Sequence, residues 1–263
     1  MRVIAVPNLK DNYAYLVIAS NGRDAAIVDP GEAPPIEAAI AAAGVRLTQI
    51  WCTHHHADHT GGVAALVAAH PGLEVIAGTV DAAKVPQTTR KVEDRDVVEL
   101  DEIRARIIHN PGHTLGAISF YIEATASEPA AVFTGDTLFA AGCGRVFEGT
   151  PPQMHESLHK LAALPAATRV YFGHEYTAAN LKFAAAVEPG SVAIQARVSE
   201  VAATRARGEF TTPSLIASEL ATNPFLRTAH VDVLAAARAR DASATDAVAA
   251  FATVRTWKNE FKG

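Results

Sequence analysis

The sequence predicts an α/β sandwich followed by a helical C-terminal region, and three observations support this fold class. Short β-rich runs alternate with turns and helical segments over the first two-thirds of the chain. A histidine-rich loop at 53–59 stands between an apolar strand and a helix, where α/β proteins tend to place their sites. Beyond residue 174 the pattern changes to helices. We therefore expect one α/β domain over 1–174, which contains the histidine-rich loop, and a helical domain over 175–263.

Length and composition are those of an ordinary globular protein. The chain has 263 residues, of which 49% are hydrophobic and 19% charged. Its net charge of −5 argues against non-specific binding to nucleic acid or to an anionic membrane. The first apolar run is too short for a signal peptide, and no stretch approaches the roughly 20 residues of a membrane span. Cys52 and Cys143 form no CxxC pair, so we expect a cytoplasmic protein, and we expect a monomer.

Ten short runs rich in β-branched and aromatic residues are predicted to be strands, and Asn21-Gly22 marks a hairpin between the second and third. The strands cover 3–6, 13–18, 25–28, 50–52, 75–77, 97–99, 105–109, 117–122, 132–134 and 170–172. Helices are predicted at 34–43, 63–69 and 152–163. The last has Thr150 as N-cap, Pro151 in its first turn and Gln153 in capping-box position. Sheets with helices between them in this order predict the α/β sandwich.

The C-terminal third is predicted to form a helical layer packed on the first domain. Pro-Gly, Gly or Asn-Pro breaks separate several of its segments. These helices are predicted at 176–187, 191–207, 213–221, 229–240 and 245–261.

The loop at 53–59 contains the motif His54-x-His56-x-Asp58-His59, which brings three imidazoles and a carboxylate within six residues. Four donors this close would crowd one small ion but suit two neighbouring metals. A surface metal-scavenging tract or an expression tag is the alternative interpretation. The run is internal and follows a strand, which favours a true site.

Three more ligand-type residues, His113, Asp136 and His174, follow predicted strands, and each comes directly after a glycine that lets a loop turn sharply. The seven donors divide naturally into His54, His56 and His113 on one metal and Asp58, His59 and His174 on a second, with Asp136 as the bridge. Imidazole with carboxylate suits zinc, with iron or manganese as alternatives. Two such ions can activate a shared water near neutral pH, which predicts hydrolysis without a nucleophilic side chain.

With these residues, the chain resembles the metallo-β-lactamase superfamily, which implies an αβ/βα sandwich with the metals at one edge. Further stretches are similar to signatures of the glyoxalase II (hydroxyacylglutathione hydrolase) family, and together they span essentially the whole chain. These stretches are 8–13, 142–150, 173–183, 188–190, 223–227 and the closing Arg255-x-x-Lys258.

This resemblance implies hydrolysis of a glutathione thioester, chiefly S-D-lactoylglutathione, to D-lactate and glutathione, the second step of methylglyoxal detoxification. It also implies that the glutathione part is held by Arg145, Tyr176, Arg255 and Lys258. Glutathione carries two carboxylates, so an acidic protein needs focused cations near its site. The spacing of Arg255, Lys258 and Lys262 alone favours a solvated helix face.

One residue departs from the pattern of the family. Phe147 stands where many relatives carry a tyrosine that contacts glutathione, so it is left out of the predicted binding residues.

Asp58 and Asp136 are the expected catalytic carboxylates, and Asp58 is also expected to orient the attacking hydroxide. A thiolate leaves readily because thiol pKa values lie near ~8.5, so no protein acid is needed. His55 and Asp29 are expected to support the ligands rather than to bind metal.

Two other functions fit parts of the sequence. The first is a persulfide dioxygenase of the same fold with one iron, but such enzymes generally lack the helical tail with its closing Arg-x-x-Lys. The second is an inactive scaffold that serves as an interaction module. Retention of all seven ligand-type residues argues against that scaffold.

Overall fold

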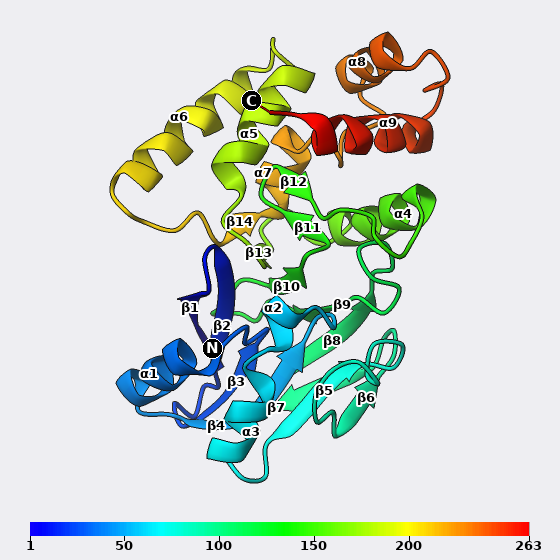
Figure 1. The fold of residues 1–263 in the computed structure, drawn as a ribbon. Helices are drawn as coiled ribbons and strands as arrows, with labels where there is room; N and C mark the ends of the chain where they lie inside the picture. Colours follow the sequence, from blue (N-terminus) through cyan, green and yellow to red (C-terminus); the bar gives the residue numbers. More distant parts are fainter. Residues whose placement is uncertain (263) are drawn as a thin grey trace.

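Two six-stranded sheets pack face to face in the computed structural model, which describes residues 1–262 (Figure 1). The first sheet has the order β1 (Arg2–Asn8), β2 (Asn12–Ile18), β3 (Asp24–Val28), β4 (Arg46–Cys52), β5 (Glu74–Gly78) and β6 (Arg90–Val92). The second has the order β14 (Ser214–Leu215), β13 (Arg169–Phe172), β10 (Ala131–Gly135), β9 (Ile118–Ile122), β8 (Ile103–His109) and β7 (Val97–Leu100). A small hairpin of β11 (Leu138–Phe139) and β12 (Gly142–Cys143) lies apart from both sheets.

The alternation of side chains along β4 shows how the layers are assembled. Because successive residues of a strand point to opposite faces, Trp51 packs between the sheets while Ile50 and Cys52 face the outer helices. Trp51 stacks on Phe120 of the second sheet, with ring centroids 5.0 Å apart. Such an aromatic pair adds about 0.5–1.5 kcal/mol beyond the burial of its surface. The sandwich is therefore held by apolar contacts on both faces of the first sheet.

Helices cover the outer faces of the two sheets, as the predicted αβ/βα arrangement requires. On the first sheet these are α1 (Ala33–Ala43) and α3 (Val63–Ala69), which bury Ile36, Ile40, Val63 and Leu66 against it. The helix α4 (Pro151–Ala162) contributes Met154 and Leu158 to the hydrophobic core that also contains Trp51 and Phe120. Its predicted capping box is present, because Thr150 and Gln153 each accept a hydrogen bond from the other's backbone N–H.

The C-terminal third forms the helical layer, which lies at one end of the sandwich (Figure 1). Its helices are α5 (Thr177–Val187), α6 (Val192–Ala206), α7 (Ile216–Thr222), α8 (Val231–Arg240) and α9 (Ala247–Glu260). The predicted helix at 213–221 starts too early, since Ser214–Leu215 pairs with β13 as the strand β14. The edge of β13 provides hydrogen-bond partners for the backbone of these two residues, so the helix α7 begins only at Ile216.

Each of the ten predicted strands coincides with an observed one, and the observed strands are mostly longer. Four elements are too short for the sequence to predict, namely β6, β11, β12 and the one-turn helix α2 (Ala57–Thr60). Within residues 1–262, no helix combines the length and the apolar character that crossing a bilayer requires.

Candidate metal centre and active site

The seven residues predicted to bind metal come together at one edge of the sandwich, although they are spread over more than a hundred positions. His54 and His56 follow β4, while Asp58 and His59 lie in α2. The remaining three follow the carboxyl ends of β8, β10 and β13, and they are His113, Asp136 and His174. The fold therefore gathers donors from four strand ends at one place.

His54, His56 and His113, the first group, direct ring nitrogens at one another. Nδ1 of His56 lies 3.2 Å from Nε2 of His54 and 3.0 Å from Nε2 of His113. His54 and His113 are buried, whereas His56 is partly exposed to the cavity described below. Three converging imidazole nitrogens could hold one divalent ion.

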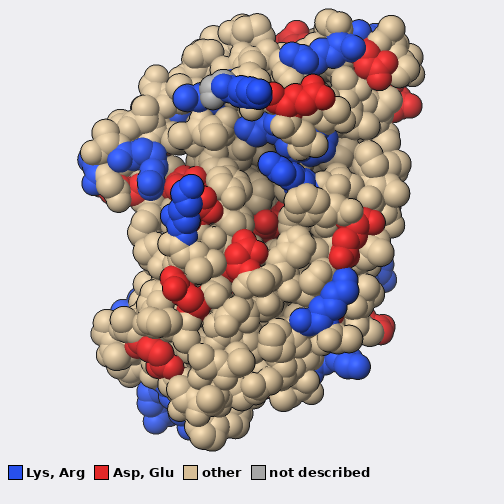
Figure 2. Space-filling view, viewed as in Figure 1, with Lys and Arg blue, Asp and Glu red and all other residues tan. Residues whose placement is uncertain are grey.

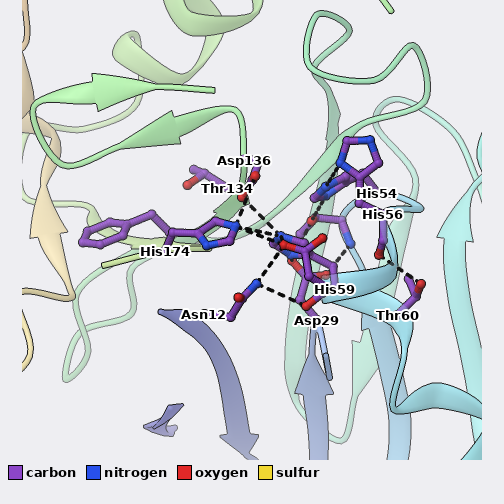
Figure 3. A network of polar contacts seen from close by, with 12 residues as sticks. Asn12, Asp29, His54, His56, His59, Thr60, Thr134, Asp136 and His174 are labelled. Carbon is purple, nitrogen blue, oxygen red and sulfur yellow. Dashed lines mark hydrogen bonds and ion pairs between the residues drawn. The ribbon is translucent and has the colours of Figure 1, made fainter. Parts of the chain in front are cut away.

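Asp58, His59 and His174 form the second group. Nε2 of His59 lies 3.3 Å from Nε2 of His174, and Oδ2 of Asp58 lies 3.4 Å from the same nitrogen of His174. Figure 3 shows that the His174 ring approaches His59 from the side away from His54 and His56. This set of two imidazoles and a carboxylate could hold a second ion.

Asp136 lies between the two groups. Its Oδ2 is 3.5 Å from Nε2 of His113 in the first group and 3.4 Å from Nε2 of His174 in the second. Its Oδ1 is 3.3 Å from Nε2 of His59, and this buried oxygen has no hydrogen-bond partner within residues 1–262. A buried carboxylate that faces both groups with an unsatisfied oxygen is consistent with a binuclear metal site.

The histidines of the two groups differ in their proton affinity. Burial lowers the pKa of His54, His56 and His113, which keeps these rings neutral with free lone pairs. Burial also opposes the charged form of His174, but the carboxylates of Asp136 and Asp58 outweigh it and raise its pKa to about 10.

The carboxylates of the site have low pKa values. The hydrogen bond from His174 holds the pKa of Asp58 well below its usual range. Burial would raise the pKa of Asp136, but His59 and His174 outweigh it and lower that pKa strongly. The site therefore presents ionised carboxylates beside imidazoles, and a divalent cation would compete with the protons of those rings.

The glycines before the ligand-type residues act in different ways. Gly135 adopts a φ of +48°, the unusual turn that the sequence analysis expects. Gly173 has no such φ; instead, a β-carbon there would collide with Oδ1 of Asp136 and lie 2.7 Å from Cε1 of His59. At Gly173 the missing side chain makes room for the site.

Of the two residues expected to support the ligands, only Asp29 has a side chain that contacts one of them. Asp29 accepts a hydrogen bond from the backbone N–H of Thr53, and its Oδ2 lies 3.0 Å from Nδ1 of His59. His55 is turned away from both groups, with Nδ1 2.9 Å from Oδ2 of the buried Asp81.

Sequence reasoning missed Asp11, the last residue of the turn between β1 and β2, and Asn12, the first residue of β2. Oδ1 of Asp11 lies 2.9 Å from Nδ1 of His174, and Asn12 donates through Nδ2 to Oδ2 of Asp58 at 3.0 Å. An Asp-Asn pair between two strands looks like ordinary turn chemistry. The one available signal was the similarity of residues 8–13 to a family signature.

A cavity of about 510 Å³ opens onto this centre between the sandwich and the helical layer. The space-filling view shows the hollow, with acidic atoms at its floor and basic atoms above them (Figure 2). The cavity is lined by all four residues predicted to bind substrate, which are Arg145, Tyr176, Arg255 and Lys258. Phe147 also lines it and is 59% exposed, with its ring centroid 5.2 Å from that of His113.

The basic residues of α9 do not form a solvated face. Arg255 is buried and donates through Nη1 to the carbonyl of Cys143 at 2.8 Å, and its buried Nε has no hydrogen-bond partner among the residues described. Lys258 is half-buried, and burial together with the nearby Arg255 lowers its pKa to about 8. Lys262 lies beyond the end of α9 and is exposed. The interpretation as a solvated face is therefore wrong for Arg255 and Lys258.

Comparisons with known proteins agree with this architecture. The family model "Metallo-beta-lactamase superfamily" matches residues 8–174, and "Hydroxyacylglutathione hydrolase C-terminus" matches residues 175–261. A hydroxyacylglutathione hydrolase of Alkalilimnicola ehrlichii is 48% identical over 98% of both chains. One from Pseudomonas aeruginosa strain LESB58 is 47% identical over 99% of this chain and 100% of the relative.

Solved structures share the fold at lower identity. ETHE1 from Myxococcus xanthus has a TM-score of 0.64 and 25% identity, over 85% of this chain and 84% of that one. TTHA1623, solved in a di-iron-bound form, has a TM-score of 0.60 and 27% identity, over 86% of this chain and 100% of that one. The relatives match this chain along nearly its whole length, including the helical layer that lines the cavity. The chain belongs to the hydroxyacylglutathione hydrolase (glyoxalase II) family of the metallo-β-lactamase superfamily.

Proposed function

We propose that this chain is a two-metal thioesterase that hydrolyses S-D-lactoylglutathione and other S-2-hydroxyacylglutathiones to glutathione and the free hydroxy acid. The observation that carries the proposal is one cavity that opens onto the donor groups and is also lined by basic residues suited to glutathione. The 44–48% identity to relatives named hydroxyacylglutathione hydrolase supports the same reaction.

The residues of the centre fit two divalent ions. The first group, His54, His56 and His113, would hold one ion, and the second group, Asp58, His59 and His174, would hold the other, with Asp136 between them. The unsatisfied buried oxygen of Asp136 supports this assignment, since a cation would satisfy it. We propose zinc, with iron and manganese as the other candidates for this donor set. When bound, such a pair of ions polarises a carbonyl oxygen and lowers the pKa of water.

Four side chains are proposed to hold the glutathione part. Arg145, Arg255 and Lys258 provide cations for its two carboxylates, and Tyr176 provides a ring and a hydroxyl at the cavity wall. The unpartnered Nε of Arg255 supports this assignment, because a buried guanidinium N–H needs an acceptor. Binding at this end of the cavity would place the thioester beside Asp58 and Asp136.

Asp58 and Asp136 are the proposed catalytic residues. The low pKa of Asp58 keeps it ionised at neutral pH, so it can accept a hydrogen bond from the attacking water and orient it. As the water oxygen bonds to the thioester carbon, the carbon–sulfur bond breaks and the sulfur leaves as thiolate. The water supplies one proton to the thiolate and leaves a carboxylic acid. Because a thiol pKa lies near ~8.5, the leaving group needs no protein acid.

The second candidate is the persulfide dioxygenase of this fold, which uses one iron. The presence of two donor groups and of the basic α9 residues in the cavity favours the hydrolase. Oxygen consumption with glutathione persulfide, in the absence of thioester hydrolysis, would support the dioxygenase instead.

The decisive experiment measures hydrolysis of S-D-lactoylglutathione together with elemental analysis of the purified protein. We expect two metal ions per chain and rapid hydrolysis. A matched thioester, S-D-lactoyl-N-acetylcysteamine, lacks both glutathione carboxylates and should have a kcat/KM at least about 10-fold lower, the equivalent of about 1.4 kcal/mol of binding. A metal-replete protein that cleaves neither thioester defeats the proposal, and equal rates on both defeat the glutathione assignment.

We further propose a monomer in a reducing compartment such as the cytoplasm. One chain supplies both donor groups and all four proposed binding residues, so the site needs no second copy. Cys52 and Cys143 are both free thiols buried in the fold, which suits a reducing environment.

A further inference from the structure

The turn between β1 and β2 leads the chain to two members of the second group of donors. Asp11, at the end of this turn, and Asn12, at the start of β2, each contact a different member of that group. Asp11 lies against Nδ1 of His174, the ring nitrogen that faces away from the donor cluster. Asn12 donates to Oδ2 of Asp58 and also, at 3.2 Å, to the backbone carbonyl of Asp58.

The backbone fixes this turn against the His174 loop. Tyr13 donates its N–H to the carbonyl of Gly173 at 2.8 Å, and Glu175 donates its N–H to the carbonyl of Asp11 at 2.9 Å. Asn12 and His174 also form an isolated antiparallel bridge. The side chain of Asp11 therefore meets the His174 ring from a backbone that is itself hydrogen-bonded to the same loop.

The supporting partners of the two groups differ in charge. In the second group, carboxylates stand behind both histidines, Asp29 behind His59 and Asp11 behind His174. In the first group the partners are neutral, since Nδ1 of His54 meets the hydroxyl of Thr53 and Nδ1 of His113 meets the carbonyl of Arg145. A carboxylate behind a histidine fixes its tautomer and makes its other nitrogen a better ligand.

We propose that Asp11 and Asn12 are positioning residues for the second metal ion, so that the β1–β2 turn is part of that metal site. Asp11 holds the His174 ring with Nε2 toward the ion, and Asn12 holds the Asp58 carboxylate. Neither side chain binds the ion itself. This inference rests on the two-metal centre of the proposed function but not on the thioester substrate.

Metal binding by the full-length chain tests this inference without any substrate. Zinc content is measured by equilibrium dialysis over a series of chelator-buffered free zinc concentrations. In Asp11→Asn, we expect one of the two zinc ions to bind about 10–100-fold more weakly and the other to bind as in the wild type. Asp11→Ala, which also removes the hydrogen bond, should weaken the same ion further, and Asn12→Ala should weaken it too.

A double-mutant cycle assigns the effect to His174. If Asp11 acts through that ring, Asp11→Asn should have no further effect on zinc binding in a His174→Ala background. Lys10→Ala is the matched control, because Lys10 lies in the same turn, is exposed and makes no side-chain hydrogen bond within the described part of the chain. It should bind both ions as the wild type does.

Four outcomes overturn the inference. The first is unchanged zinc binding in both Asp11→Ala and Asn12→Ala. The second is equal weakening of both ions with a lowered melting temperature of the metal-free protein, which indicates a general role in folding. The third is an effect of Asp11→Asn on zinc binding that is as large in the His174→Ala background as in the wild type. Loss of thioesterase activity without a change in zinc binding also counts against it, whereas a wild type that binds two ions but cleaves no thioester contradicts only the proposed function.

Discussion

The carboxylate of Asp136 packs directly against Gly173, with no room for a methyl group between them. Gly173 precedes His174 on the neighbouring strand end, so the same position sets the approach of both residues to the centre. A β-carbon there would displace Asp136, the one residue that faces both donor groups.

Gly173→Ala should therefore lower kcat by about 100-fold, because a displacement of about 1 Å at a catalytic group is enough for such a loss. Metal content should fall together with kcat, and elemental analysis measures it on the same preparation. Gly190→Ala is the matched control, since a β-carbon at Gly190 meets nothing within 4 Å. Wild-type metal content and kcat in Gly173→Ala would show that Asp136 can move without consequence.

Asp136→Ala tests the bridge itself. Without this carboxylate the two groups lose their common donor, and we expect kcat for S-D-lactoylglutathione to fall by at least about 100-fold, or roughly 2.7 kcal/mol. Circular dichroism should show an intact fold, because the side chain contacts the site rather than the core. Unchanged activity in this variant would contradict the binuclear interpretation.

The protonation of Lys258 should make substrate binding depend on pH. Its pKa of about 8 means that the side chain loses its positive charge as the pH rises through that value. A neutral amine attracts a carboxylate more weakly, so KM should rise between about pH 7.5 and 9.5 while kcat changes less. Steady-state kinetics across this pH range measures KM and kcat separately.

The control is Lys258→Arg, whose guanidinium stays charged throughout that range. Its KM should remain flat with pH. If KM rises as steeply in Lys258→Arg as in the wild type, the titrating group is not Lys258.

A buried ion pair joins two helices of the helical layer, α6 and α7. Glu219 of α7 is fully buried, with Oε1 2.5 Å from Nη2 of Arg197, and its Oε2 accepts the backbone N–H of Ala141 at 2.7 Å. Glu219→Ala leaves the largely buried Arg197 guanidinium without its carboxylate partner and should destabilise the protein by about 3–5 kcal/mol. A lower urea midpoint with an unchanged slope would demonstrate this loss.

The exposed pair of Arg207 and Glu209 serves as the comparison, since both side chains are more than half exposed. Glu209→Ala should leave the urea midpoint unchanged because water screens such a pair. Equal shifts in the two variants would contradict the importance of burial at Glu219.

Local sequence patterns predicted most of the secondary structure. Runs rich in β-branched and aromatic residues located all ten predicted strands, and the Thr150 capping box placed the start of α4. These patterns failed where tertiary pairing decides the outcome. Residues 214–215 become a strand only because β13 offers an open edge.

The sequence by itself determined which residues have the chemistry of a metal site, because histidine and carboxylate spacing in the 53–59 loop and the Gly-ligand pattern at strand ends are local features. The sequence also predicted how these residues divide into two groups, but only the tertiary structure gave the distances that place Asp136 between them, because those distances join separate strand ends. The tertiary structure also decided that Asp11 and Asn12 belong beside the site and that Arg255 is buried. These roles depend on contacts between segments far apart in the chain, which local spacing cannot record.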